Sequence, residues 1–391
     1  MIKPVEIGLE RFVNSSPKHL RRADMGLLAN QASVGSNLEH AVQLIDRAMP
    51  GRLKTLFGPQ HGFAGEKQDN MIESDHGREP ATGRNIYSLY GETRRPLPEM
   101  LSDLDVLIVD LVDVGTRVYT FAQTMAYCLE EAARQGLKVI VLDRPNPIGG
   151  TQIEGNLLKP DCASFVGLFP IPMRHGLTIG ELAGFIAGHL DPSPDLEIIP
   201  LLGWKRDMYY QETGLFWVMP SPNMPTPETA LVYPGQVIWE GTNISEGRGT
   251  TRPFHLCGAP FIDPLSLKTE LDNYDLPGVY FRPASFEPAF NKYKGQLCHG
   301  LEIQPIDRLS YQPYRTSLTI LEVLLRLYPG RIAWKTPPYE YEYERCPLDL
   351  ILGDKLIRKG LEKGGQAADL AGEWEGELNS FKKERGKYLL Y

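Results

Sequence analysis

Residues 54–63, KTLFGPQHGF, decide the fold, because an apolar run passes directly into a Pro/Gly turn that carries two polar side chains, Gln60 and His61. A short apolar run bounded by such a turn is consistent with a buried strand of a parallel sheet. In open α/β sheets, ligands bind at the carboxyl ends of the strands. We therefore expect Gln60 and His61 to lie at a ligand site.

Four further segments combine an apolar run or a flexible backbone with polar side chains: MGLLANQ (25–31), VLIVDLVD (106–113), KVIVLDRPNPIGG (138–150) and NISEGRGTTR (243–252). The first half of the chain alternates β-branched runs with helical periods, which is typical of βαβ units. We expect strands over residues 25–29, 53–57, 106–111 and 139–142. The predicted fold class is therefore α/β, with a Rossmann-like parallel sheet.

Two helices are predicted in this half. Residues 118–135 place apolar side chains on one face, and Gly136 supplies a common helix terminator. A second helix should begin at Thr178, because Thr178 and Glu181 have the spacing of a capping box.

The Pro-rich stretch 219–227, MPSPNMPTP, continues neither a helix nor a strand. We therefore place a domain boundary there, between a catalytic domain (1–226) and a smaller α+β auxiliary domain (227–391), with the active-site cleft between them. The second domain should contain strands over 278–282 and 301–305 and an amphipathic helix over 316–328. A last helix should carry Leu370, Trp374, Leu378 and Phe381 on one face.

Composition excludes several classes of protein. The 391 residues are 42% hydrophobic and carry a formal charge of -8 spread without long runs, so no basic patch for nucleic acid or for an anionic membrane is expected. No window approaches a membrane span of about 20 apolar residues. The amino-terminal residues lack a signal sequence, which predicts a cytoplasmic protein or one whose leader was removed. Five widely spaced cysteines without a C-x-x-C pair favour reduced, structural thiols.

Motifs for cofactors are absent from the sequence. No G-x-G-x-x-G follows the predicted strands, and no P-loop motif occurs, so no nucleotide cofactor is expected. The eight histidines form no H-E-x-x-H motif or close pair, which predicts no metal site. The lack of G-x-S-x-G also argues against a Ser-His-Asp hydrolase.

An acidic loop, EKQDNMIES (66–74), follows the first candidate site. Met71 and Ile72 are expected to pack on protein and to place Glu73 in a partly apolar setting. Burial raises the pKa of a carboxyl group into the range useful for a general acid. Glu73 is thus the first candidate for a proton donor, with a solvated loop as the alternative.

Polar residues at the other strand ends form a candidate binding set: Asn30, Gln31, Arg117, Asp143 and Asn146. The loop beyond the predicted boundary adds Glu240, Asn243, Glu246, Arg248 and Arg252. We expect this loop to face the first domain, and in particular Gln60, His61, Asn30, Asp143 and Glu240 to converge on one cleft. The alternative for the loop is an internal network of salt bridges.

The chain resembles a known family along nearly its whole length. The matching segments are LLANQASV, LFGPQHGF, IYSLYGETRRPLPEML, DLVDVGTRVYT, LDRPNPIGG, IPMRHGLTIGELA, SPNMPTPETALVYPG, EGTNISEGRGTTRPF and KYLLY. They are similar to the NamZ-type exo-β-N-acetylmuramidases, formerly catalogued as a domain of unknown function, which remove N-acetylmuramic acid from peptidoglycan fragments. The resemblance implies an exo-acting glycoside hydrolase of cell-wall recycling that acts at the non-reducing end. It also implies that His175 lies in the cleft, and that Arg248 or Arg252 binds the lactyl carboxylate of the substrate.

One departure from the family pattern concerns catalysis. Members usually read Gly-Pro-Glu-His-Gly, whereas position 60 here is Gln. Glutamine cannot supply a proton, although it can hold a water or a substrate amide. His61 could protonate near neutral pH. Two alternatives therefore stay open: a catalytically silent protein that binds muropeptides or amino sugars, and a hydrolase of a different amino sugar.

Overall fold

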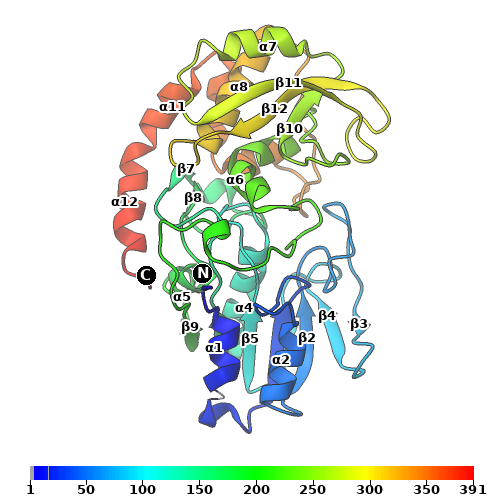
Figure 1. Ribbon diagram of the computed structural model, residues 1–391, viewed down its shortest axis with the longest axis vertical. Coiled ribbons are helices and arrows are strands. Elements are labelled where there is room, and N and C mark those ends of the chain that lie inside the picture. The colour runs from blue at the N-terminus through cyan, green and yellow to red at the C-terminus, as the bar shows by residue number, and fades with distance from the viewer. Residues whose placement is uncertain (1–3, 16) are drawn as a thin grey trace.

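The computed structural model describes residues 4–15 and 17–391 (Figure 1). Its main feature is a seven-stranded sheet in the order β3-β4-β2-β1-β5-β6-β9. All neighbouring strands are parallel except β3 and β4. The strands are β1 (Met25–Ala29), β2 (Leu53–Gly58), β3 (Gly77–Arg78), β4 (Asn85–Ser88), β5 (Val106–Asp110), β6 (Lys138–Leu142) and β9 (Leu196–Ile199). The four strands predicted from apolar runs are confirmed.

The register of the sheet brings several strand ends to one edge. Leu28 of β1 pairs with Phe57 of β2 and with Val109 of β5. Every residue of β1 and β5 is buried, as expected for parallel strands covered on both faces. The loops that follow β1, β2 and β5 therefore start side by side, and the loops after β2 and β5 supply part of the site described below.

Helices cover both faces of this sheet. On one face, α1 (Gly8–Ser15) and α2 (Ala41–Ala48) bury apolar residues such as Phe12 and Ile45. On the other face lie α4 (Phe121–Gln135) and α5 (Ile179–Ala187), and α3 (Pro98–Leu101) is short. The predicted capping box of Thr178 and Glu181 is present. The helix expected over 118–135 begins three residues later than predicted, because residues 118–120 belong to a loop.

The second half of the chain contains a three-stranded antiparallel sheet in the order β10-β12-β11. These strands are β10 (Leu256–Ala259), β11 (Val279–Phe286) and β12 (Cys298–Pro305), and α7 (Pro264–Leu271) and α8 (Pro313–Leu327) pack beside them. The predicted strands and amphipathic helix of this region are confirmed. The fold class, α/β with a smaller α+β part, is thus as expected.

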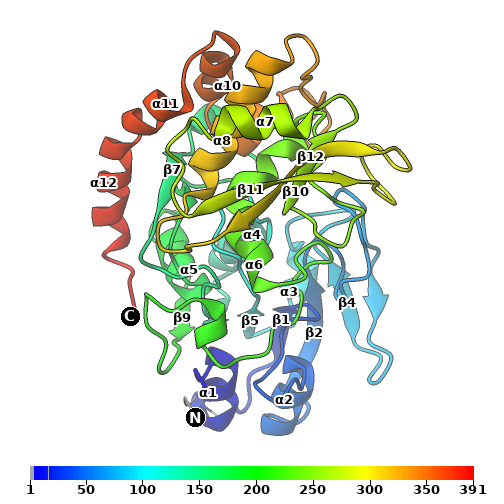
Figure 2. The same cartoon turned by 45° about the horizontal axis from the view of Figure 1, so that its top comes forward.

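The remaining elements lie outside these two sheets and the helices already named. They are η1 (Lys18–Leu20), β7 (Glu154–Leu157), η2 (Pro160–Cys162), β8 (Pro172–Arg174), η3 (Tyr210–Glu212), α6 (Pro227–Gln236), η4 (Val237–Gly241), α9 (Pro347–Leu352), α10 (Lys355–Glu362), α11 (Ala367–Glu373) and α12 (Glu375–Arg385). Figures 1 and 2 show α11 and α12 running down one side of the molecule, so that the carboxyl end of the chain lies beside the first sheet.

The single helix predicted around Trp374 is instead two helices, α11 and α12, with Trp374 at the turn between them. The ring of Trp374 packs 5.5 Å from that of Tyr314 of α8, which anchors the turn. All four residues predicted for its apolar face still pack against the core.

The five cysteines are free, and four of them are buried. Across the described ranges, 4–15 and 17–391, every helix is too short or too polar to cross a membrane. In the same part of the chain, no three His, Cys, Asp or Glu side chains are grouped as they would be to hold a metal ion.

Candidate active site

A small cavity of about 40 Å³ lies beyond the carboxyl end of β2. Its walls come from segments on both sides of the predicted domain boundary. The lining residues are Gln60, His61, Asn70, Val118, Tyr119, Thr120, Phe121, Val166, Ser221, Asn223, Met224, Tyr233, Glu240, Arg248, Phe254, Tyr339 and Glu340. Of the residues predicted from the sequence, four therefore meet here: Gln60, His61, Glu240 and Arg248.

Gln60 is held in one orientation by two buried partners. Its Nε2 donates to Oε1 of Glu340 at 3.1 Å, and its Oε1 accepts from the hydroxyl of Thr120. The turn that presents it includes His61 and Gly62, which both have positive φ angles, 74° and 87°. The amide of Gln60 thus connects the loop after β2 to a carboxylate 280 residues away in sequence.

Glu340 is the most important residue that the sequence prediction missed. It is only 4% exposed, and besides Gln60 it accepts a hydrogen bond of 2.7 Å from the hydroxyl of Tyr90. Burial raises the pKa of Glu340 to about 7; the nearby charge of Glu240 acts in the same direction, and the hydrogen bonds from Tyr90 and Gln60 oppose it. A carboxyl group with such a pKa keeps a substantial protonated fraction near neutral pH, as a general acid requires.

Glu240 lies in η4 and has a contrasting environment. It accepts hydrogen bonds from Arg248 Nη2 at 2.7 Å, from the Tyr339 hydroxyl at 2.8 Å and from Asn70 Nδ2 at 3.1 Å. Burial alone would raise the pKa of Glu240, but the charge of Arg248 and these hydrogen bonds outweigh it, and the pKa lies below its ordinary value. Near neutral pH the cavity therefore combines an ionised carboxylate with a carboxyl group that is partly protonated.

Arg248 is buried among acidic side chains. Besides Glu240, it lies 3.2 Å from Glu246 and 3.9 Å from Asp69. Glu246, a predicted binding residue, is buried behind Arg248 and is also held by Lys292 at 2.8 Å. Glu246 thus supports Arg248 and does not line the cavity itself.

His61 does not have the protonation behaviour predicted for it. Its Nδ1 donates to the carbonyl of Lys67 at 2.8 Å, and the ring is buried. Burial lowers the pKa of His61 to about 4, and the hydrogen bond to Lys67 offsets this only in part. The prediction that His61 protonates near neutral pH is wrong, and the ring enters any reaction as a neutral imidazole.

Glu73 lacks the apolar setting expected of it. Its side chain is 57% exposed, it accepts from the Tyr341 hydroxyl at 2.9 Å, and it lies 3.7 Å from Arg94. Ile72, which was expected to cover it, is itself exposed. The premise for Glu73 as the general acid, burial in a partly apolar setting, is therefore wrong.

Asp143 and Asn146 belong to a network that holds the end of the chain, away from the cavity. Asp143 accepts hydrogen bonds from Thr178, from the Gly180 backbone and from the Tyr391 hydroxyl, at 2.8, 2.7 and 2.6 Å. Asn146 donates to the Leu177 carbonyl at 2.9 Å. The carboxylate that follows β6 is thus occupied by protein groups, which explains why its predicted role in the cleft is not met.

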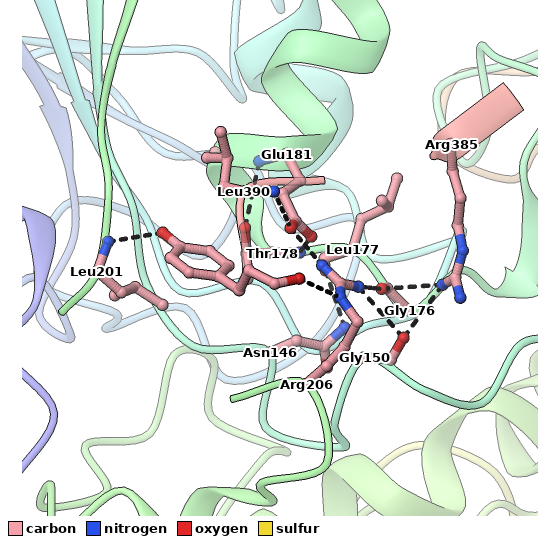
Figure 3. A network of polar contacts seen from close by, with 12 residues as sticks. Asn146, Gly150, Gly176, Leu177, Thr178, Glu181, Leu201, Arg206, Arg385 and Leu390 are labelled. Carbon is pink, nitrogen blue, oxygen red and sulfur yellow. Dashed lines mark hydrogen bonds and ion pairs between the residues drawn. The ribbon is translucent and has the colours of Figure 1, made fainter. Parts of the chain in front are cut away.

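Figure 3 shows the centre of this network. Arg206 lies between Glu181 and the carbonyl groups of Gly150 and Gly176, and Arg385 of α12 reaches the same two carbonyls. The backbone nitrogen of Leu390 donates to Glu181 at 2.8 Å.

Four other predicted binding residues also make their polar contacts within the protein: Asn30, Gln31, Arg117 and His175. Asn30 and Gln31 donate to the carbonyls of Pro220 and Met219, at 2.9 and 2.7 Å. Arg117 is fully buried and donates to four backbone carbonyls, those of Asn156, Ile171, Ile351 and Leu352. His175 lies 3.3 Å from Asp113, with both side chains buried.

Two residues of the loop at 243–252 line other hollows. Arg252 pairs with Glu302 at 3.2 Å and borders a separate cavity of about 590 Å³. Asn243 donates to the Arg331 carbonyl at 2.9 Å and borders a third hollow. Neither residue contributes to the cavity that contains Gln60.

A signal for Glu340 is present in the sequence. The stretch 336–347, TPPYEYEYERCP, alternates tyrosine with glutamate between prolines, which resembles the polar, Pro-bounded loops at the strand ends. Because it follows no predicted strand, it was not linked to the site.

Comparison with known proteins gives consistent matches over the whole chain. A model described as "Exo-beta-N-acetylmuramidase NamZ, N-terminal" matches residues 25–228, and the corresponding C-terminal model matches residues 231–391. The chain is 42% identical over 388 residues to the peptidoglycan beta-N-acetylmuramidase NamZ of Bacillus subtilis (strain 168), a match that covers 99% of this chain and 91% of that protein.

Two crystal structures of DUF1343 family proteins from Bacteroides fragilis NCTC 9343 share the fold. The first, at 1.65 Å resolution, has a TM-score of 0.90 at 33% identity, and the match covers 100% of both chains. The second, at 1.30 Å resolution, has a TM-score of 0.78 at 27% identity and covers 100% of this chain and 99% of the other.

Proposed function

Because the chain belongs to the exo-β-N-acetylmuramidase NamZ family, we propose that it is an exo-acting glycoside hydrolase that releases N-acetylmuramic acid from the non-reducing end of peptidoglycan fragments. The observation that carries this proposal is the pair of buried carboxyl groups, Glu340 and Glu240, whose pKa values shift in opposite directions in one cavity. Most glycosidases use two such groups with different protonation states.

Glu340 is the general acid in this proposal. Protonated near neutral pH, it donates its proton to the glycosidic oxygen as the bond to the leaving sugar breaks. Gln60 and Tyr90 hold the carboxyl group from both sides, which fixes the direction of that transfer. Gln60 therefore acts as a positioning residue, and its inability to donate a proton is compatible with turnover.

Glu240 stabilises the positive charge that develops on the sugar. Its charge is maintained by Arg248, Tyr339 and Asn70. An acetamido sugar can supply its own nucleophile, in which case an ionised carboxylate orients the acetamido group; otherwise Glu240 activates water or attacks directly. The configuration of the released sugar distinguishes these routes.

Arg248 is the guanidinium best placed to bind the lactyl carboxylate. It lines the cavity, whereas Arg252 does not. Its Nε lies 3.2 Å from Glu246, whereas its buried Nη1 makes no hydrogen bond in the described part of the chain and lies 3.9 Å from Asp69, so Nη1 is the donor that remains for a substrate anion. The carboxylates of Glu240, Glu246 and Asp69 repel an anion, so a substrate carboxylate binds here only through a direct contact with the guanidinium of Arg248.

Substrate entry requires movement of the loops around the cavity. A volume of about 40 Å³ admits water but no sugar ring, since small-molecule sites usually measure about 300 Å³ or more. Glu340 and Tyr341 have positive φ angles of 45° and 66°, which are uncommon for residues with a side chain. We expect the loop that contains them to shift outward when the substrate enters.

The test is hydrolysis of two chromogenic substrates, the 4-nitrophenyl β-glycosides of N-acetylmuramic acid and of N-acetylglucosamine. The proposal requires release of nitrophenol from the muramic acid compound and at least tenfold slower release from the other. Binding of N-acetylmuramic acid in calorimetry without any hydrolysis would instead identify a silent sugar-binding protein. Faster release from the glucosamine compound would identify a hydrolase of a different amino sugar.

A further inference from the structure

The third hollow, of about 510 Å³, which Asn243 borders, lies beside the candidate active site and is more open than the cavity. It is lined by side chains from three loops, and we call it the side pocket. Its principal residues are Asn243, Asn291, Lys292, Tyr293, Trp334 and Lys335.

Two sets of contacts join the side pocket to the cavity. Asn291 Nδ2 donates to both carboxylate oxygens of Asp69, at 2.9 Å each, and Asp69 lies 3.9 Å from Arg248. The ammonium of Lys292 donates to Glu246, which lies behind Arg248, and to the carbonyl of Trp239 at 2.6 Å. The wall between the two hollows thus consists of residues that hold the catalytic cluster.

Lys335 provides a third connection and a free charge. Its ammonium lies 5.0 Å from the centre of the Tyr339 ring, and the Tyr339 hydroxyl binds Glu240. Among the residues of the described ranges, the ammonium has no hydrogen bond or ion pair with a side chain. It is therefore available to a ligand in the side pocket.

The chemistry of the pocket suits an amino sugar. Trp334 and Tyr293 are partly exposed and offer apolar ring surfaces, and the ammonium of Lys335 is a free donor beside them. The polar groups of Asn243, Asn291 and Lys292 are bonded within the protein and fix the walls of the pocket. Apolar surfaces with a few fixed polar groups are typical of small-molecule sites, and 510 Å³ lies within their usual range. A sugar has both an apolar ring face and several hydroxyl groups.

We propose that the side pocket binds the leaving part of the substrate, the N-acetylglucosamine residue joined to the terminal muramic acid, with Trp334 stacked on its ring. The inference rests on the proposed function, because an exo-acting enzyme encloses the terminal sugar and leaves the remaining chain in an open site next to it. In the proposed arrangement, the outward shift of the loop that contains Glu340 and Tyr341 joins the cavity to the side pocket, and the glycosidic oxygen lies next to Glu340.

The experiment compares two substrates that differ only in the leaving group. One is the disaccharide of N-acetylmuramic acid linked β to N-acetylglucosamine, and the other is the methyl β-glycoside of N-acetylmuramic acid, which has no ring to stack. Trp334→Ala should lower kcat/KM for the disaccharide about three- to tenfold, the range expected when an aromatic contact is lost. It should leave kcat/KM for the methyl glycoside within about twofold of the wild type.

Two variants control for structural damage, since Trp334 also donates to Glu362 at 2.6 Å. Trp334→Phe keeps an aromatic face but loses this hydrogen bond, and it should retain most of the activity on the disaccharide. Tyr280→Ala removes an exposed aromatic side chain of β11 that does not line the side pocket, and it should leave the rates on both substrates unaffected.

Equal losses on both substrates, or a Trp334→Phe variant as poor as Trp334→Ala, would show a structural role and overturn the inference. An unchanged disaccharide rate in Trp334→Ala would overturn it too. Wild-type protein that cleaves neither substrate would refute the proposed function first, and the side-pocket inference would fall with it.

Discussion

Glu340→Gln should separate the catalytic role of this carboxyl group from its effect on folding. The variant keeps the shape of the side chain, but its single amide oxygen can accept from only one of the two donors, Tyr90 or Gln60, and it cannot donate a proton to a leaving oxygen. General acid catalysis typically contributes about 10²- to 10⁴-fold, so turnover should fall by about that factor. Substrate binding should change little.

The effect on stability depends on pH, and its sign follows from the raised pKa. Folding raises the pKa of Glu340 from 4.5 to about 7. Between these pH values the folded protein therefore binds more protons than the unfolded chain. As the pH rises over this range, the free energy of unfolding of the wild type falls by about 3 kcal/mol. This stability is fully present below pH 4.5 and is lost as the pH rises through 7. The amide does not titrate. The free energy of unfolding of Glu340→Gln minus that of the wild type should therefore be about 3 kcal/mol more favourable to the variant at pH 8 than at pH 4.

Urea unfolding at both pH values measures this difference, and hydrolysis of the chromogenic muramic acid glycoside measures turnover. Glu73→Gln is the matched control, because it makes the same chemical change at an exposed neighbour of the site. It should leave turnover within about threefold of the wild type. If Glu73→Gln abolished turnover and Glu340→Gln did not, the assignment of the general acid would be wrong. An equal stability difference at pH 4 and pH 8 would refute the raised pKa.

Three further predictions concern pH, position 60 and the end of the chain. In the wild type, kcat/KM should fall above about pH 7, because Glu340 loses its proton there. Below pH 7 it should stay level down to about pH 5, because the lowered pKa of Glu240 keeps that carboxylate ionised. A rate that still rises at pH 8 would contradict this prediction. Gln60→Glu should move the alkaline limb of that profile to higher pH, because a second carboxylate beside Glu340 disfavours the ionisation of Glu340. The rate at pH 6 should change little or fall. Activity found only in this variant would favour a silent wild-type protein. Tyr391→Phe should lower the free energy of unfolding by about 1–3 kcal/mol, since it removes a donor to buried Asp143, without changing turnover at 25 °C; a loss of turnover with unchanged stability would place Tyr391 in the site instead.

The strands were predictable because a parallel sheet covered on both faces requires apolar runs. β1, β5 and β6 have nearly continuous ones, and in β2 a shorter run, Leu56–Gly58, is buried. The start of α4 was predicted too early because residues 118–120 continue the apolar pattern but line the cavity instead. An apolar side chain facing a cavity and one facing the core look alike in a sequence.

The site was only partly predictable for a related reason. The strand-end pattern selected Gln60, and the Gly-rich loop beyond the predicted boundary selected Glu240, and both line the cavity. The strand-end pattern also selected Asp143, whose partners Thr178 and Tyr391 satisfy it within the protein. Burial also raises the pKa of Asp143 to about 7, so even that property does not by itself mark a catalytic group. Glu340 was missed because its burial arises from partners 250 and 280 residues away.

The hydrogen bond between Tyr391 and Asp143 joins residues 248 positions apart, and it has a consequence for how the protein is made. Ribosomes add about 5–20 residues per second, so Asp143 leaves the ribosome roughly 10 to 50 s before Tyr391 is synthesised. During that interval the nascent sheet has its strands but lacks the segment that satisfies Asp143, Glu181 and Arg206. The first half of the chain is therefore expected to bind chaperones until residues 388–391 pack against it. Ribosome-stalled chains that lack residues 388–391 should be more sensitive to proteases than chains that include them.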